Sequence, residues 1–369
     1  MPHEPPAAAP GHRAPSTRAL SDEAWSRSRA WFRGVHAEGV TEYANLSRQP
    51  DALAQGGWWA VVAEFEGDVH AWRFADVERS ARVVRDAGPW HGPVAQEWTS
   101  SMDRTAYTAA VAAVRAAIRD GEVYQANICR ILTARLPGRP DPAPLAVRLA
   151  RGNPAPYAAL IDVPEVPGTP GCWVVSASPE LSIEVADGTI ASGPIKGTAA
   201  RESELLEKDR TENVMITDLV RNDLQRVCRP GTVTVTDLLR AEHHPGLVHL
   251  VSRVRGNLHI DPARDRTQWQ AILAATHPPG SVSGAPKSSA LRLIDQLESA
   301  PRGPYCGQIG WIDADRGTAR LAVGIRTFWW SDGTLAFGTG AGITWGSDPA
   351  GEWSETELKA ARLLGLASR

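Results

Sequence analysis

The sequence has few cysteines, very few lysines, almost no net charge and no long apolar run. Its four widely spaced cysteines include no Cys-x-x-Cys pair, which excludes a disulfide framework and a cysteine zinc site and favours a reducing cytoplasm. The 39 basic and 42 acidic residues leave a net charge of −3, which argues against a nucleic-acid-binding protein. No apolar run approaches about 18 residues, so no membrane span is expected. The N-terminus lacks a basic-then-apolar pattern, so no signal peptide is expected either.

The scarcity of lysine makes each remaining lysine informative. Only four of the 39 basic residues are lysine. A guanidinium does not lose its proton in a protein, so lysine is retained where a compact amine with an adjustable pKa is needed. For a lysine at an average position, the simpler interpretation is favoured: the residue has been retained on the surface by chance. The four are Lys196, Lys208, Lys287 and Lys359.

The length of 369 residues allows two domains or one large unit. Residues 1–20 are rich in Pro and Ala and are predicted to be a disordered tail. Residues 21–100 contain seven of the fourteen tryptophans, which we interpret as core rather than as a ligand site. The rest of the chain, residues 101–369, forms the third predicted segment.

Predicted strands that follow one another in runs, with few strand–helix–strand units, indicate an α+β fold built on antiparallel sheets. A hairpin is expected over residues 58–65 and 69–74, and an amphipathic helix over 104–119, before Asp120-Gly121. The further predicted strands are 123–136, 172–177, 182–185, 247–258, 308–313, 319–330 and 335–343. The further predicted helices are 203–228, 267–275, 285–299 and 349–366.

The first candidate site is the segment 192–198, Ser-Gly-Pro-Ile-Lys-Gly-Thr. Proline and two glycines around one lysine predict a rigid loop that approaches other groups closely. A partly desolvated Lys196 would have a lowered pKa and could act as nucleophile or base. The alternative is a surface lysine in a turn.

Two pairs of carboxylates form the second candidate. Asp209 and Glu212, and likewise Glu352 and Glu355, are three residues apart on predicted helices, which places both carboxylates of a pair on one face. If the two faces meet, their like charges need a cation, and ligands that are all oxygen suit Mg²⁺. A single pair is more often a solvated helix face.

Two glycine-rich segments come third. Residues 280–287 open a predicted helix, whose free backbone N–H groups and positive dipole end favour an anion. Residues 338–343 end a predicted strand. Neither has the spacing of a P-loop or of a dinucleotide-binding loop.

Together with further segments, these motifs resemble the chorismate-utilising enzymes, which include anthranilate, aminodeoxychorismate, isochorismate and salicylate synthases. The resemblance implies large antiparallel β-sheets packed as a sandwich with helices outside, and it makes residues 101–369 the chorismate-binding catalytic region. The matching segments are 124–127, 178–181, 194–198, 209–213, 221–224, 249–250, 280–287, 302–307, 325–327, 340–342 and 352–359.

Two positions separate the reactions within this family. Hydrolytic members carry Ala where Lys196 stands and a lysine base where Gln125 stands, and anthranilate-type members also lack the loop lysine. Lys196 together with Gln125 therefore resembles aminodeoxychorismate synthase component I. The resemblance implies that Lys196 attacks the chorismate ring at C2, that Glu180 protonates the departing C4 hydroxyl, and that ammonia adds at C4 and displaces Lys196.

The same resemblance implies the remaining site residues. The predicted Mg²⁺ ligands are Asp209, Glu212, Glu352 and Glu355. For two of the predicted binding residues a structural role is the alternative, an ion pair for Arg326 and a hydrogen-bonded core imidazole for His249. The residues predicted to bind the substrate are Thr198, His249, Ser281, Tyr305, Arg326, Gly340, Ala341, Gly342 and Lys359.

The expected function is the conversion of chorismate and ammonia to 4-amino-4-deoxychorismate, with Mg²⁺, in the cytoplasm. The product would supply p-aminobenzoate and folate, or an antibiotic precursor. No amidotransferase domain is expected, so a separate glutamine amidotransferase subunit would deliver the ammonia, and neither nucleic acid nor membrane is an expected partner. The alternatives are anthranilate synthase component I, a 2-amino-2-deoxyisochorismate synthase and a non-catalytic chorismate-binding subunit.

Overall fold

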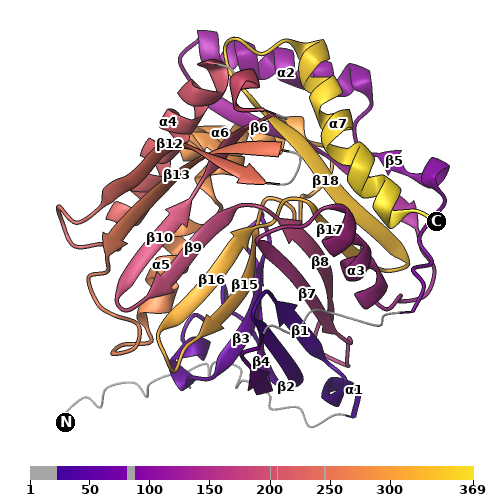
Figure 1. Ribbon diagram of the computed structural model, residues 1–369, viewed down its shortest axis with the longest axis vertical. Helices are drawn as coiled ribbons and strands as arrows, with labels where there is room; N and C mark the ends of the chain where they lie inside the picture. Colours follow the sequence, from indigo (N-terminus) through magenta and orange to yellow (C-terminus); the bar gives the residue numbers. More distant parts are fainter. Residues whose placement is uncertain (1–22, 81–87, 200, 206, 245–246) are drawn as a thin grey trace, which may run out of the picture.

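The computed structural model describes residues 23–80, 88–199, 201–205, 207–244 and 247–369 as a large antiparallel sheet with helices on its outside (Figure 1). The predicted α+β class is confirmed. The predicted tail, residues 1–20, lies outside the described residues. The helices are α1 (Glu23–Ser26), α2 (Arg104–Arg119), α3 (Ala143–Gly152), α4 (Glu207–Gln225), α5 (Gln268–Thr276), α6 (Lys287–Leu297) and α7 (Pro349–Ala367).

Eighteen strands of the described residues are linked by antiparallel pairings into one hydrogen-bonded sheet. They are β1 (Arg29–Phe32), β2 (Val35–Asn45), β3 (Trp58–Ala63), β4 (Val69–Glu78), β5 (Thr99–Ser100), β6 (Gln125–Arg135), β7 (Tyr157–Val163), β8 (Cys172–Ser178), β9 (Leu181–Ala186), β10 (Thr189–Gly193), β11 (Ile195–Ala199), β12 (Thr234–His244), β13 (Leu247–Asn257), β14 (Gly284–Ala285), β15 (Gln308–Asp313), β16 (Thr318–Val323), β17 (Thr327–Ser331) and β18 (Thr334–Ile343).

The order of pairing brings distant parts of the chain together. β6 pairs with β18, which continues through β17, β8, β7 and β1 to β2. From β2 the sheet runs through β4, β3, β15, β16, β9 and β10 to β13. β13 also pairs with β11 and β12. Strands from both halves of the chain therefore alternate within the sheet.

The tryptophan-rich N-terminal hairpin is part of the core, as predicted. β3 pairs with β4 on one side and with β15 on the other. Trp58 is 5% exposed and stacks on Trp311 of β15, with ring centroids 6.2 Å apart. These rings serve packing rather than ligand binding.

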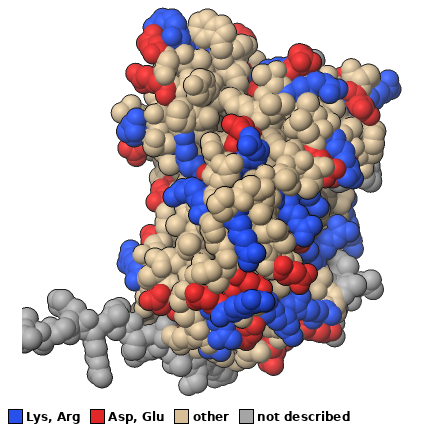
Figure 2. Space-filling model, turned by 90° about the vertical axis from the view of Figure 1, so that its left-hand side faces the viewer, with Lys and Arg blue, Asp and Glu red and all other residues tan. Residues whose placement is uncertain are grey.

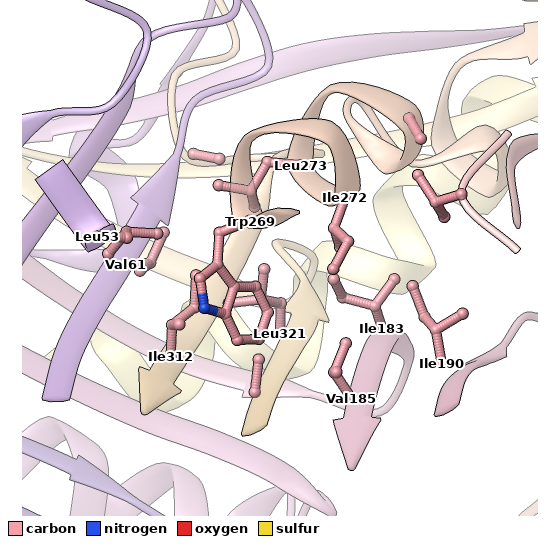
Figure 3. Packing of buried hydrophobic residues seen from close by; sticks show 14 of the residues in the cluster. Leu53, Val61, Ile183, Val185, Ile190, Trp269, Ile272, Leu273, Ile312 and Leu321 are labelled. Carbon is pink, nitrogen blue, oxygen red and sulfur yellow. The ribbon is translucent and has the colours of Figure 1, made fainter. Parts of the chain in front are cut away.

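A second core lies beneath α5 (Figure 3). Trp269 is fully buried and points from the helix onto the sheet, where Ile312 of β15 and Leu321 of β16 surround it. Ile183 and Val185 of β9 extend the same layer. This packing holds β9, which follows Glu180, firmly against the helix layer.

The segment 192–198 differs from the predicted loop. It ends β10 and forms β11, which pairs with β13 with an irregular register between Ile195 and Thr198. Ile195 is β-branched and suits a strand, whereas Gly197 has φ +81° and breaks the regular pairing. The close approach is confirmed, because a Cβ at Gly197 would lie 2.7 Å from Cβ of Asp209.

The glycine-rich segment 280–287 also differs in detail. A short 3-10 turn, Gly280–Val282, is followed by the two-residue strand β14, which pairs with β6. α6 begins only at Lys287, since Pro286 stands at its N-cap position. The second glycine-rich segment ends β18, as predicted.

Surface charge and cysteine state agree with the sequence. All four cysteines are free and buried. Basic and acidic side chains are interspersed over the face shown in Figure 2, without a continuous basic stripe. None of the helices in the described ranges combines the length and the apolar character needed to cross a bilayer.

Candidate active site

Three ionisable side chains from separate parts of the sheet come close together. Lys196 lies on β11, Glu180 lies between β8 and β9, and Arg326 precedes β17. The Glu180 carboxyl interacts electrostatically with both cations and forms a hydrogen bond with the Ser281 side chain. Burial raises the pKa of Glu180 despite these interactions, which lower it. A buried carboxyl group with a raised pKa holds its proton at higher pH and suits general acid catalysis.

Backbone contacts fix the position of Glu180. Its N–H donates to Oγ of Ser178 at 3.3 Å, and that hydroxyl donates to the carbonyl of Val323 at 2.7 Å. The Val323 N–H donates back to the Glu180 carbonyl at 3.0 Å. The acid is therefore held between β8 and β16 with little freedom.

Arg326 adopts a backbone conformation that is unfavourable for its type. Its φ is +53°, in the left-handed region, and its carbonyl accepts a 3.0 Å hydrogen bond from the N–H of Ala177. Such strain persists where surrounding structure fixes it and is common at functional sites. Here it turns the chain between β16 and β17 beside Glu180.

A small cavity of about 20 Å³ adjoins Glu180, which is room for about one water molecule. Its polar lining includes Ser192, Asp223 and Ser281. The Asp223 carboxylate accepts a 2.7 Å hydrogen bond from Nζ of Lys287. The Glu180 carboxyl group therefore lies beside a small polar cavity.

Gln125 lies at the start of β6, next to the last residues of β18. It is 1% exposed, and its Oε1 has no hydrogen-bond partner. A Cβ at Gly342 would lie 2.4 Å from Nε2 of Gln125, so the glycine makes room for this amide. A buried acceptor without a partner indicates a place where a hydrogen-bond donor can bind.

The other glycines of β18 make room for further side chains. A Cβ at Gly338 would lie 2.0 Å from the ring of Tyr305, which is buried. The carbonyl of Gly340 accepts a 3.1 Å hydrogen bond from Nζ of Lys359. Ala341, which lies between Gly340 and Gly342 in the strand, is also buried. β18 therefore forms a close-packed wall between Gln125, Tyr305 and Lys359.

Glutamates from α4 and α7 form an acidic cluster with a lysine among them. Nζ of Lys208 lies 3.0 Å from Oε1 of Glu352 and 3.8 Å from Oε1 of Glu212. Glu212 interacts electrostatically with both Glu352 and Glu355, so the two predicted carboxylate faces meet. Burial raises the pKa of Glu212, and Lys196 and Lys208 oppose that shift.

The donor set of this cluster fits Mg²⁺. Its ligand atoms are carboxylate oxygens, and Oε1 of Glu212 is buried without a hydrogen-bond donor. As the side chains stand, no three His, Cys, Asp or Glu residues within the described ranges converge closely enough to hold a metal ion. Asp209, the fourth predicted ligand, packs against Gly197.

The remaining predicted residues lie around these groups. His249 is buried in β13, opposite Thr198 of β11 and Glu242 of β12. The structure adds Lys208 to the candidate site, because it pairs with Glu212 and Glu352; it was not among the predicted site residues. Its position four residues before Glu212, on the same helix face, was the available signal.

Comparisons with known proteins show the family to which the chain is similar. The sequence model of the family described as chorismate binding enzyme matches residues 16–365. Anthranilate synthase component 1 1 of Halobacterium salinarum is 38% identical over 324 residues, which are 83% of this chain and 59% of that protein. Aminodeoxychorismate synthase of Streptomyces pristinaespiralis is 40% identical over 271 residues, which are 70% of this chain and 36% of that protein.

The fold is also found in a solved structure. Anthranilate synthase component I from Streptococcus pneumoniae matches with a TM-score of 0.73 at 22% identity, over 96% of this chain and 95% of that one. At this level of identity the likeness establishes the fold alone. The chain spans less than two thirds of the length of the two curated relatives.

Proposed function

The chain belongs to the chorismate-binding enzyme family, and from that premise we propose that it aminates chorismate at C4. This is the activity of an aminodeoxychorismate synthase component I. The observation that carries the proposal is the combination of Lys196 beside the buried acid Glu180 with a neutral Gln125 amide.

The proposed reaction uses Lys196 and Glu180 as a nucleophile and acid pair. The Lys196 amine forms a bond to C2, both conjugated double bonds of the ring shift by one position, and the C4 hydroxyl leaves as water with the proton of Glu180. Ammonia then adds at C4, both double bonds shift back, and the C2–N bond to Lys196 breaks. The proton released by the adding ammonia returns to the Glu180 carboxylate.

Gln125 supports ammonia rather than water as the second nucleophile. A neutral amide cannot remove a proton from water, so water is not activated at this position. Its buried Oε1 accepts hydrogen bonds and has no protein donor, which suits an N–H of ammonia.

The carboxylates of the substrate require positive charge. Arg326 offers a planar, bidentate donor pair for one carboxylate. Glu212, Glu352 and Glu355 would hold Mg²⁺, with Asp209 behind Gly197. When bound, this ion would neutralise and orient a substrate carboxylate.

We propose that a separate glutamine amidotransferase subunit supplies the ammonia in the cytoplasm. The product would serve p-aminobenzoate and folate synthesis or the synthesis of an antibiotic precursor.

Anthranilate formation is the second candidate, because several curated relatives, such as those of Saccharolobus solfataricus and Streptomyces coelicolor, are named anthranilate synthase component 1. Incubation with chorismate, Mg²⁺ and ammonium, followed by mass spectrometry, separates the two. An aminated product that retains the enolpyruvyl group is expected. Release of pyruvate with anthranilate would replace the first proposal by the second, and unchanged chorismate would contradict both.

A further inference from the structure

Lys208 occupies an unusual place in the acidic cluster. It lies in the first turn of α4, and its ammonium donates a 3.0 Å hydrogen bond to Oε1 of Glu352 on α7. Glu352 is only 3% exposed, so this carboxylate is removed from water and needs a positive partner. The lysine therefore links two helices through a buried charge.

The same ammonium also faces Glu212, one helical turn along α4. The distance to Oε1 of Glu212 is 3.8 Å, which is an ion pair without a hydrogen bond, and that oxygen has no other donor. Lys208 thus stands where the glutamates of α4 and α7 face each other. Any cation that bridges these two helices has to share or take that position.

The second lysine near the cluster is placed differently. Lys359 binds Glu355 at 2.6 Å and donates to the Gly340 carbonyl at 3.1 Å. It therefore fixes the α7 side of the cluster to β18 rather than bridging the carboxylates of the two helices. Lys196, on β11, also interacts electrostatically with Glu212.

We propose that Lys208 is an internal cation that competes with Mg²⁺ for Glu352 and Glu212. Its ammonium neutralises the two carboxylates and holds α4 against α7, and binding of the metal requires the lysine to swing away. The side chain of Lys208 is 39% exposed, so it has solvent into which it can move. Lys208 therefore sets the Mg²⁺ concentration above which the metal binds, and it holds α4 and α7 together at lower concentrations. The proposal rests on the metal site of the proposed function.

The test is a calorimetric titration of the full-length chain with Mg²⁺ alone, without chorismate. Lys208→Met removes the charge and keeps the length of the side chain. If the lysine occupies the site in nine of ten molecules, its removal lowers the apparent dissociation constant of Mg²⁺ about tenfold. Lys208→Gln should tighten binding in the same way, and Lys208→Arg should not.

A melting experiment gives a second readout and a matched control. In chelator, Lys208→Met should melt below the wild type, and Mg²⁺ should restore most of the loss. Lys287→Met removes another lysine that pairs with a carboxylate of α4, 2.7 Å from Oδ2 of Asp223. Its loss of stability should not respond to Mg²⁺, and its affinity for Mg²⁺ should stay unchanged.

Weaker or equal Mg²⁺ binding in both neutral variants would overturn the competition, as would the absence of Mg²⁺ binding in the wild type and both variants. These outcomes differ from failure of the proposed function. A protein that shows tighter Mg²⁺ binding in Lys208→Met but makes no aminated product keeps the inference and loses the proposed reaction.

Discussion

Two identical substitutions on β18 should differ in effect, one lowering mainly stability and the other mainly activity, because the side chains that they meet differ in freedom. Gly338→Ala would place Cβ 2.0, 2.3 and 2.5 Å from three ring atoms of Tyr305. Tyr305 is 4% exposed and packs in one core cluster with Cys129 and Cys306, so the ring has nowhere to move. Overpacking of this kind costs about 1–3 kcal/mol. For a chain of 369 residues that corresponds to a fall in melting temperature of about 1–4 °C.

Gly342→Ala meets a single close atom, Nε2 of Gln125 at 2.4 Å. This atom is the end of a flexible side chain, and turning it costs about 0.5–1.5 kcal/mol. The melting temperature should therefore stay within about 2 °C of the wild type. The amide, however, leaves its place, and ammonium-dependent consumption of chorismate should fall about tenfold, equivalent to about 1.4 kcal/mol in the barrier.

The assay measures melting temperature and ammonium-dependent turnover of both variants side by side. The two glycines lie on one strand, so each variant controls for the other. A larger loss of stability in Gly342→Ala than in Gly338→Ala would refute the reasoning. So would wild-type ammonium-dependent turnover in Gly342→Ala.

Four further outcomes test the site. Lys196→Ala should abolish efficient amination while the fold remains, and near-normal turnover, or failure to trap an adduct on the lysine, would contradict its role as nucleophile. Glu180→Gln should lower turnover about 10²- to 10⁴-fold. Because burial raises the pKa of Glu180 in the folded protein, the contribution of this carboxyl to stability is full below its unfolded pKa of about 4.3 and is lost as pH rises through the raised pKa. The melting temperature of Glu180→Gln relative to the wild type should therefore increase as pH rises above about 4.3. Activity should disappear in chelator and return with Mg²⁺, and Glu212→Gln should weaken Mg²⁺ and chorismate together; full activity in excess chelator would argue against the metal. Gln125→Lys combined with Lys196→Ala should yield more isochorismate than either change alone. If the double variant binds chorismate but forms no isochorismate, Gln125 does not select the nucleophile.

Local signals in the sequence predicted α2 correctly to the residue. Asp103 accepts a 2.8 Å hydrogen bond from the N–H of Ala106, and Asp120-Gly121 ends the helix, as the composition indicated. The hairpin of β3 and β4 was equally clear, since its strands are apolar and its turn contains glycine.

Elements stabilised by tertiary contacts were missed or misread. α3 begins among prolines and has only ten residues, yet it packs on α7 and β8. β12 contains charged residues and is half exposed, and its pairing with β13 is what makes it a strand. The segment around Lys196 contains turn-forming residues, but the edge of β13 draws it into the sheet.

The candidate site shows the same division. The motifs identified Lys196, Glu180 and the carboxylate pairs, because their residue types and spacings carry the chemistry. The contact of Lys208 with Glu352 and the fit of Gly342 against Gln125 depend on distances between elements far apart in the chain. Such distances have no local signature.

The pairing of β6 with β18 has a consequence for synthesis of the protein on the ribosome. Arg130 of β6 donates a hydrogen bond to Thr356 of α7, 226 residues later. During translation β6 therefore waits for its partner strand until nearly the whole chain has been made. Contacts of such long range slow folding and leave an unpaired strand edge open to aggregation. Rare codons or a stall late in the reading frame would thus expose β6, and chaperone binding to nascent chains should peak before β18 leaves the exit tunnel.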